Sequence, residues 1–273
     1  MSASETSRRL RLAFVGWGAI ATRVAELLTE RQAAIDIVAI AVRDAAKARP
    51  DVPTGARLIS SPSKLAGLGL DMVIEAAGRA SVPVWAEAAL RHSRRFVVSS
   101  TSAFCDDALL ARLVEIAREQ GSQIVVPPGA LGGMDALTAA STLPLDTVVH
   151  SIVKPPLAWR GTGAEALLDL DALETRAVFF SGTAREAADR FPQNANVAVI
   201  SALAGIGLDR TRVELVADPA VSRNCHRLSA SGAFGHMEML FENEPLKTNP
   251  KSSEMTALNL VRLVENQLAP LAH

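Results

Sequence analysis

The chain has 273 residues, of which 49% are hydrophobic, and this is enough for two modest domains with apolar cores. A net charge of −1 gives no basic field for nucleic acid. No apolar run reaches the roughly 18 residues that a membrane span needs. The polar start of the chain, 1–9, lacks the apolar stretch of a signal peptide. We therefore expect a cytoplasmic protein with no nucleic-acid or membrane partner.

The first pattern along the chain is typical of a dinucleotide-binding turn. A short apolar strand leads into Gly16 and Gly18, and a helical pattern follows at once. Gly16 allows a sharp turn, and the missing side chain of Gly18 lets a pyrophosphate approach the backbone. The free N–H groups at the helix start would bind that anion. We predict that Gly16, Gly18, Ala19 and Ile20 contact a dinucleotide.

The next apolar run, 35–42, has the composition of a buried parallel strand, and it ends in Arg43 and Asp44. An acidic residue at this strand end binds the ribose hydroxyls of NAD, whereas an arginine can bind the 2′-phosphate of NADP. The plainer alternative is that both are ordinary polar residues after a strand. Because both residue types are present, we predict that the protein binds NAD and NADP.

Strand and helix patterns continue to alternate through the first half of the chain. Ala77 follows one of the strands, and small residues there would let the nicotinamide ribose pass close to the backbone. Six strands alternating with helices predict an α/β fold, a doubly wound parallel sheet of Rossmann type. The further strands are expected at 57–60, 71–75, 95–99 and 123–126, and the further helices at 63–68, 81–92 and 106–120.

The alternation ends at 127–133, where two prolines and three glycines indicate a domain boundary. We expect a dinucleotide-binding domain at 1–128 and a second, α+β domain at 129–250 built on an open sheet. The end of the chain, 251–273, is expected to pack back on the first domain, and the apolar strands of the second favour a homodimer. The later strands are expected at 147–153, 177–180, 211–217, 224–230 and 236–242, and the helices at 134–141, 184–190, 196–203 and 255–268.

Several segments are familiar when they are taken together and in order. They are GWG at 16–18, DMVIEAA at 71–77, PPGALGGMD at 127–135, FPQNANV at 191–197, DP at 218–219 with NCH at 224–226, and NPKSS at 249–253. This set resembles the L-aspartate dehydrogenase family over nearly the whole chain after residue 10.

The resemblance implies an NAD(P)-dependent enzyme that interconverts L-aspartate with oxaloacetate and ammonia through iminoaspartate, which feeds NAD biosynthesis in some organisms. By motif matching, Ala130 and Asn196 fall on cofactor-contacting positions of the family, and His226 falls on its active-site histidine.

A dianionic substrate such as aspartate needs cations and hydrogen-bond donors. The candidate substrate-binding residues are Lys154, at a strand end before two prolines, together with Thr183, Asn194 and Lys251. Plainer alternatives exist for three of them. Lys154 could be a solvated surface lysine, and Thr183 and Asn194 could cap the helices that follow them.

His226 is the candidate acid–base residue, because imidazole exchanges protons close to neutral pH. Arg223 and Arg227 beside it could support an anionic substrate. From the residues alone, a histidine packed within a sheet is the plainer interpretation, and the resemblance favours catalysis. The other four histidines, His150 among them, have no such context. No spacing of histidine, cysteine and aspartate predicts a metal site.

Two other classes of function stay open at this point. One is a related two-domain dehydrogenase or reductase, either homoserine-dehydrogenase-like or dihydrodipicolinate-reductase-like, and a panel of substrates would separate these enzymes. The other is a non-catalytic NAD(P)-sensing protein, which would need a partner surface and would not reduce the cofactor when L-aspartate is added.

Overall fold

The computed structural model describes residues 8–47, 49, 51–192 and 195–272. The chain forms two compact units. Unit 1 contains the chain up to Pro127 together with the segment from Leu260 onward, and unit 2 is Pro128–Asn259. Within the described ranges, no helix is long and apolar enough to cross a membrane.

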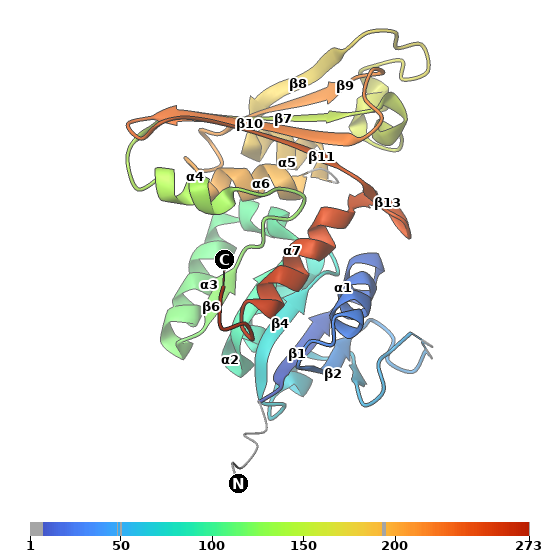
Figure 1. Cartoon of the computed structure of the whole chain (residues 1–273), viewed down its shortest axis with the longest axis vertical. Coiled ribbons are helices and arrows are strands. Elements are labelled where there is room, and N and C mark those ends of the chain that lie inside the picture. Colours follow the sequence, from blue (N-terminus) through green and yellow to red (C-terminus); the bar gives the residue numbers. More distant parts are fainter. Residues whose placement is uncertain (1–7, 48, 50, 193–194, 273) are drawn as a thin grey trace. The chain divides into compact units, whose positions relative to one another are not determined.

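Unit 1 is built on a six-stranded sheet in the order β3-β2-β1-β4-β5-β6, in which every pair of neighbours is parallel (Figure 1). The central strand β4 is buried at every position, as a strand covered on both faces must be. This order confirms the predicted doubly wound sheet of Rossmann type. The elements are β1 (Leu10–Val15), α1 (Ala19–Glu30), β2 (Ile35–Ala41), β3 (Arg57–Ile59), β4 (Leu70–Glu75), α2 (Val82–His92), β5 (Ser93–Val98), α3 (Asp107–Gln120) and β6 (Gln123–Val125).

One predicted helix of unit 1 is wrong. The sequence predicts a helix over 63–68, but the structure has only a short 3₁₀ turn, Pro62–Leu65. Gly67 and Gly69 follow it with φ of +73° and +60°, a left-handed conformation that ends a right-handed helix. The predicted stop of the helix before Gly121 is confirmed, because Gly121 adopts the left-handed C-cap conformation with φ of 62°.

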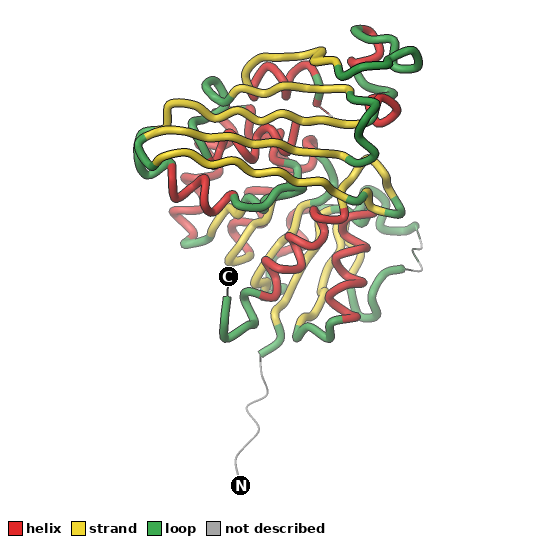
Figure 2. Tube along the Cα trace, turned by 45° about the horizontal axis from the view of Figure 1, so that its top comes forward, coloured by secondary structure: helices red, strands yellow, loops and turns green. Residues whose placement is uncertain are grey.

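Unit 2 contains a five-stranded sheet in the order β11-β10-β7-β9-β8, with β7 and β9 parallel and the other pairs antiparallel. Helices α4, α5 and α6 lie on one face of this sheet in Figure 1, and Figure 2 looks onto its other face. The predicted open-sheet α+β architecture is confirmed. The elements are α4 (Met134–Ala140), β7 (Leu145–Lys154), β8 (Ala177–Thr183), α5 (Ala184–Arg190), α6 (Ala195–Ala204), β9 (Arg212–Ala217), β10 (Asn224–Gly232), β11 (Gly235–Asn243), β12 (Pro245–Leu246), β13 (Asn249–Ser253) and α7 (Glu254–Glu265).

The alternation of side chains along β7 decides what faces the helices of unit 2. Val148, His150 and Ile152 are all almost fully buried. Because neighbouring strands keep their side chains in step, the residues of β10 that lie opposite them share this face. This arrangement brings titratable side chains into an apolar core, next to α6.

Helix α7 begins in unit 2 and ends in unit 1. Near its end, Glu265 accepts two hydrogen bonds from Arg31, which directly follows α1, at 2.6 and 3.1 Å. The last turns of α7 are therefore held to unit 1 by a two-point ion pair.

Candidate active site

The turn after β1 is closed tightly against the loop after β4. Gly16 has φ of +92°, and a Cβ atom there would lie 2.7 Å from the Cβ of Ala77 and 2.9 Å from the carbonyl oxygen of Ala76. Only glycine fits this conformation and this space. The turn therefore brings Gly16 and Ala77, two predicted cofactor residues, into direct contact.

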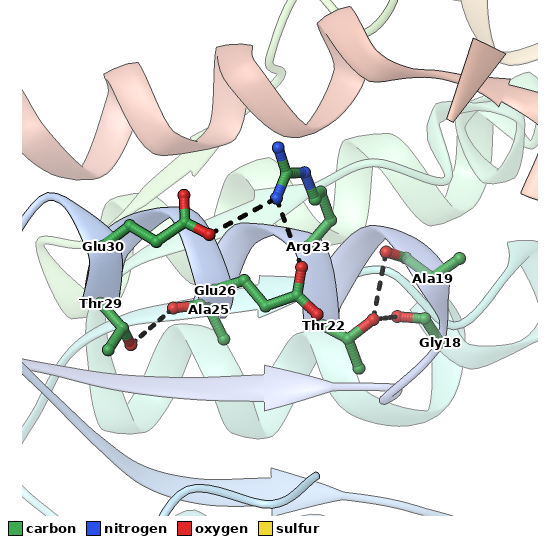
Figure 3. Close-up of polar contacts among 8 residues, drawn as sticks. All are labelled: Gly18, Ala19, Thr22, Arg23, Ala25, Glu26, Thr29 and Glu30. Carbon is green, nitrogen blue, oxygen red and sulfur yellow. Dashed lines mark hydrogen bonds and ion pairs between the residues drawn. The ribbon is translucent and has the colours of Figure 1, made fainter. Parts of the chain in front are cut away.

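The N-terminus of α1 is open to a ligand. Gly18 is its N-cap, no side chain caps the helix, and its first turn contains no acidic residue. A Cβ atom on Gly18 would meet nothing within 4 Å. Figure 3 shows that the hydroxyl of Thr22 points back to the carbonyl oxygens of Gly18 and Ala19, each 3.2 Å away, and so does not cap the N–H groups. Free N–H groups beside open space are what a pyrophosphate requires, so this part of unit 1 fits a dinucleotide.

The residues after β2 form an exposed turn. Oδ1 of Asp44 accepts hydrogen bonds from the backbone N–H groups of Ala46 and Lys47 at 3.0 and 3.3 Å. Arg43 precedes it and is also exposed. The turn holds Asp44 in place at the carboxyl end of β2, where the predicted ribose contact would be made.

A buried carboxyl group organises the two loops that follow β4 and β5. Glu75 is fully buried and accepts five hydrogen bonds. Two come from the backbone N–H groups of Ala77 and Gly78, one from the Ser81 hydroxyl, and two from the N–H and hydroxyl of Ser100. Each buried donor without an acceptor would cost about 1–3 kcal/mol. Glu75 therefore fixes the loop that carries Ala77.

In unit 2, two histidines meet on the helix-covered face of the sheet. His226 lies opposite Ile152 and His150 opposite Leu228, so the rings approach along the diagonal, with Nε2 of His150 3.3 Å from Nδ1 of His226. Burial lowers the pKa of His150 to about 4. Burial, followed by electrostatic interaction with His150 and Lys154, lowers the pKa of His226 well below its ordinary value. Both rings are therefore neutral at pH 7.

Lys154, at the end of β7, belongs to the same cluster. It lies two residues beyond Ile152 and so on the same face, and its charge acts on His226. Its Nζ atom lies 5.0 Å from the centroid of the Trp159 ring, a cation–π contact. Burial lowers the pKa of Lys154 to about 8, which leaves it mostly charged at neutral pH. It is not the solvated surface lysine of the plainer alternative.

The structure separates Thr183 from this cluster. Thr183 ends β8, three strands from β10, which is roughly 14 Å at about 4.8 Å per step. Its hydroxyl accepts a hydrogen bond from the Glu186 N–H, and the Glu186 carboxylate accepts one from the Thr183 N–H, so the predicted cap is confirmed as a full capping box. Its role in substrate binding stays a prediction.

The remaining predicted residues lie in other parts of unit 2. Ala130 is buried, and its carbonyl oxygen accepts a hydrogen bond of 2.9 Å from Asn243. Asn196 lies in the first turn of α6, and Lys251 is exposed on β13, outside the five-stranded sheet. Asn194 lies outside the described residues.

Two parts of this site were missed from the sequence. The sequence alone assigns His150 no role, yet its ring is the neighbour of the His226 ring. The signal in the sequence is that Val148 and Ile152 lie two positions before and two positions after His150. Apolar residues at this spacing mark the inward face of a strand. Glu75 is an acidic residue within an apolar strand, which marks a buried polar role. Among the described residues, no group of three or more histidine, cysteine, aspartate and glutamate side chains could hold a metal ion.

Comparison with known proteins identifies the family. The profile described as aspartate dehydrogenase, C-terminal, matches residues 135–267, and the profile described as homoserine dehydrogenase, NAD binding domain, matches residues 16–127. An L-aspartate dehydrogenase of Brucella anthropi is 58% identical over 98% of this chain and 98% of its own length. The chain belongs to the L-aspartate dehydrogenase family. It is an oxidoreductase, and these matches confirm NAD(P) as its cofactor.

Further relatives of the family agree with this assignment. An L-aspartate dehydrogenase of Cupriavidus necator is 39% identical over 94% of this chain and 97% of its own length. The crystal structure of aspartate dehydrogenase from Thermotoga maritima superposes with a TM-score of 0.76 at 26% identity, covering 97% of this chain and 100% of that chain. A homoserine dehydrogenase from Thiobacillus denitrificans, with a TM-score of 0.58 at 12% identity over 96% of this chain and 75% of its own, shares the fold alone.

Replacing Gly18 with valine is expected to lower NAD(P) affinity at least about tenfold while the protein still folds. Gly18 has φ of −103° and ψ of −173°, an extended conformation that valine adopts, and the added side chain would fill the space beside the helix N-terminus. Fluorescence titration with NADH measures the affinity, and thermal unfolding measures the fold.

Gly16→Ala is the contrasting variant. Its positive φ and its overlap with Ala77 predict a lowered Tm as well as weaker binding. Unchanged NADH affinity in Gly18→Val would contradict the assignment of this turn as the pyrophosphate site.

Proposed function

We propose that the protein oxidises L-aspartate to iminoaspartate, which water converts to oxaloacetate and ammonia, and that it also catalyses the reverse reaction. The observation that carries this proposal is a neutral, buried His226 beside the charged Lys154, in a chain of the L-aspartate dehydrogenase family. An amino dicarboxylate substrate requires a base for a proton of its amino group and a cation for a carboxylate, and this cluster contains both.

The proposed reaction assigns the proton steps to His226. Bound NAD(P)⁺ supplies the acceptor for the hydride that leaves C2 of the substrate. His226 accepts a proton from the amino group as the C=N bond forms. Protonated His226 returns that proton to the imine nitrogen and then accepts a proton from the water molecule that attacks the imine carbon. Transfer of this second proton to nitrogen lets ammonia leave as the C–N bond breaks, and the added hydroxyl group loses its proton to solvent as it becomes the C=O group of oxaloacetate. In the reductive direction, protonated His226 returns the proton to nitrogen.

Burial prepares His226 for the role of a base. Its lowered pKa keeps the ring unprotonated at neutral pH, so a lone pair is available before the reaction begins. The nearby charge of Lys154 acts in the same direction. His226 is therefore expected to stay active as a base well below pH 6.5, the ordinary pKa of histidine.

Lys154 is the proposed partner of a substrate carboxylate. It shares the sheet face with the two histidines and is mostly charged at neutral pH. Thr183, Asn194 and Lys251 are proposed as further substrate-binding residues from the sequence. The Thr183 hydroxyl also caps α5.

The cofactor contacts are proposed by position. The first turn would hold the pyrophosphate, Arg43 and Asp44 the adenosine ribose or its 2′-phosphate, and the loop after β4 the nicotinamide side. The proposed residues are Gly16, Gly18, Ala19, Ile20, Arg43, Asp44 and Ala77 in unit 1, and Ala130 and Asn196 in unit 2.

We also infer that the enzyme works as a homodimer in the cytoplasm. The sheet face of unit 2 opposite the helices supports the dimer, because the apolar side chains of Val178 and Leu240 are 47% and 53% exposed there. Light scattering of the purified protein would measure its mass and so its oligomeric state.

The test of the proposed function is the absorbance of NADH formed with a panel of substrates. L-aspartate is expected to give rapid NADH formation, and oxaloacetate and ammonia are expected to accumulate in equal amounts. L-homoserine serves as the comparison substrate, because homoserine dehydrogenases share the fold. Faster turnover of L-homoserine than of L-aspartate would contradict the proposal.

His226→Ala is expected to lower kcat about 10²- to 10⁴-fold, the usual contribution of general acid–base catalysis. NADH affinity should stay nearly unchanged, because the proposed pyrophosphate site lies in unit 1. His236→Ala is the matched control, since His236 is an exposed histidine on β11. Near-normal kcat in a folded His226→Ala protein would make His226 a packed strand histidine.

Lys154→Met is expected to raise the KM for L-aspartate about tenfold or more, with a smaller change in kcat, because the lost charge binds a carboxylate. In the wild type, the KM should rise above pH 8, where Lys154 loses its proton. Steady-state kinetics across pH measure both effects, and Lys247→Met, at an exposed lysine, is the control. An unchanged KM in Lys154→Met would remove Lys154 from the substrate site.

Arg43→Ala is expected to weaken NADP binding several-fold and to leave NAD binding nearly unchanged, because only NADP carries the 2′-phosphate. Titration with each cofactor measures this. Arg57→Ala, at the opposite end of the neighbouring strand β3, is the control. Undetectable NADP binding in the wild type would contradict dual use.

A further inference from the structure

A chain of three buried side chains connects α6 to β7 and β10. Nε2 of His150 lies 3.3 Å from Nδ1 of His226, and Nδ1 of His150 lies 2.9 Å from the hydroxyl oxygen of Ser201. The Ser201 hydroxyl lies 3.0 Å from the carbonyl oxygen of Ala198. His150 and Ser201 are completely buried, and His226 is 4% exposed. Water therefore does not compete for these hydrogen bonds.

The number of available protons decides the direction of every bond in this chain. The carbonyl oxygen of Ala198 can only accept, so the single hydroxyl proton of Ser201 points to it. The Ser201 oxygen must then accept from Nδ1–H of His150. A neutral His150 has one N–H, so its Nε2 is an acceptor, and Nδ1 of His226 must donate to it. The lone pair of neutral His226 is therefore on Nε2.

We propose that His150, itself oriented by Ser201, is a positioning residue that holds His226 in the Nδ1–H tautomer and so directs its basic Nε2 towards the reaction. The proposal rests on the proposed function of His226. When Nε2 takes a proton, the ring becomes a cation whose Nδ1–H still donates to His150, and this charge-assisted bond stabilises the protonated state. Without His150, either nitrogen could carry the proton and the ring could rotate.

The other groups around His226 leave this assignment unchanged. From β7, the titratable groups that act on it are His150 and Lys154, and Lys154 carries donors only, so it cannot take the proton of Nδ1. From β11, the residue opposite is Phe241, which has no hydrogen-bonding group. Helix α6 contributes the Ser201 hydroxyl, which binds His150.

The experiment compares His150→Phe with His150→Gln. Phenylalanine keeps a buried ring but removes both nitrogens, whereas glutamine keeps an acceptor for Nδ1–H of His226 and a donor for Ser201. We expect kcat to fall at least about tenfold in His150→Phe, a part of the usual acid–base contribution. His150→Gln should keep most of kcat, and the KM for L-aspartate and NADH affinity should change little in both. Equal kcat in wild type and a folded His150→Phe would overturn the proposal, as would equal losses in both variants.

The tautomer of His226 is measured directly by ¹⁵N NMR of the histidine side chains in the wild-type enzyme at pH 7. We expect Nδ1 of His226 to have the shift of a protonated ring nitrogen and Nε2 that of an unprotonated one, with His226→Ala identifying the signals. In Ser201→Ala, a second variant in case His150→Phe does not fold, this preference should weaken. A wild-type His226 protonated on Nε2 would overturn the proposal. The NMR measurement reports the tautomer without turnover. A failure of the proposed function would instead appear as normal kcat in His226→Ala, so the two failures can be told apart.

Discussion

A buried imidazole ring must stay neutral, and its one N–H must find an acceptor. This constraint shapes unit 2 around His226. Removing the ring from water lowers its pKa and keeps it unprotonated, but leaves an N–H donor that an apolar core cannot satisfy. His150 supplies the acceptor, Ser201 supplies the acceptor for His150, and a helix carbonyl ends the chain. The direction of each hydrogen bond is therefore set by the next bond in this chain, which runs from β10 through β7 to α6.

Unit 1 contains a buried carboxyl group whose hydrogen bonds are satisfied in a similar way. The side chain of Glu75 is fully buried, and none of its hydrogen-bond donors among the described residues is a cation. Its carboxyl oxygens accept five hydrogen bonds from the loops after β4 and β5. The same loop packs Ala77 against Gly16 at a distance that excludes any side chain on the glycine. The turn after β1 and the loop after β4, which carry proposed cofactor residues, are thus fixed against one another, and this reduces the entropy that a dinucleotide would lose on binding.

Most of the fold could be predicted from local patterns, because strand and helix periodicities and the glycine turn are properties of short segments. The helix expected at 63–68 failed because two glycines with positive φ follow its first turn. The Thr183 cap was predictable from a threonine three residues before a glutamate. The partner of His226 was not, because His150 lies 76 positions away in the chain and their diagonal contact depends on the register of β7 against β10. Glu75 was overlooked for the same reason, since part of its donors come from Ser100 on another loop.

In the proposed reaction, hydrogen leaves C2 of L-aspartate as hydride, and the side chains of the protein transfer only protons. The most direct measurement uses L-aspartate carrying deuterium at C2, followed by mass spectrometry of the NADH formed. We expect one deuterium in each NADH, together with equal amounts of unlabelled oxaloacetate and ammonia. NADH without deuterium, or no NADH from L-aspartate, would contradict it.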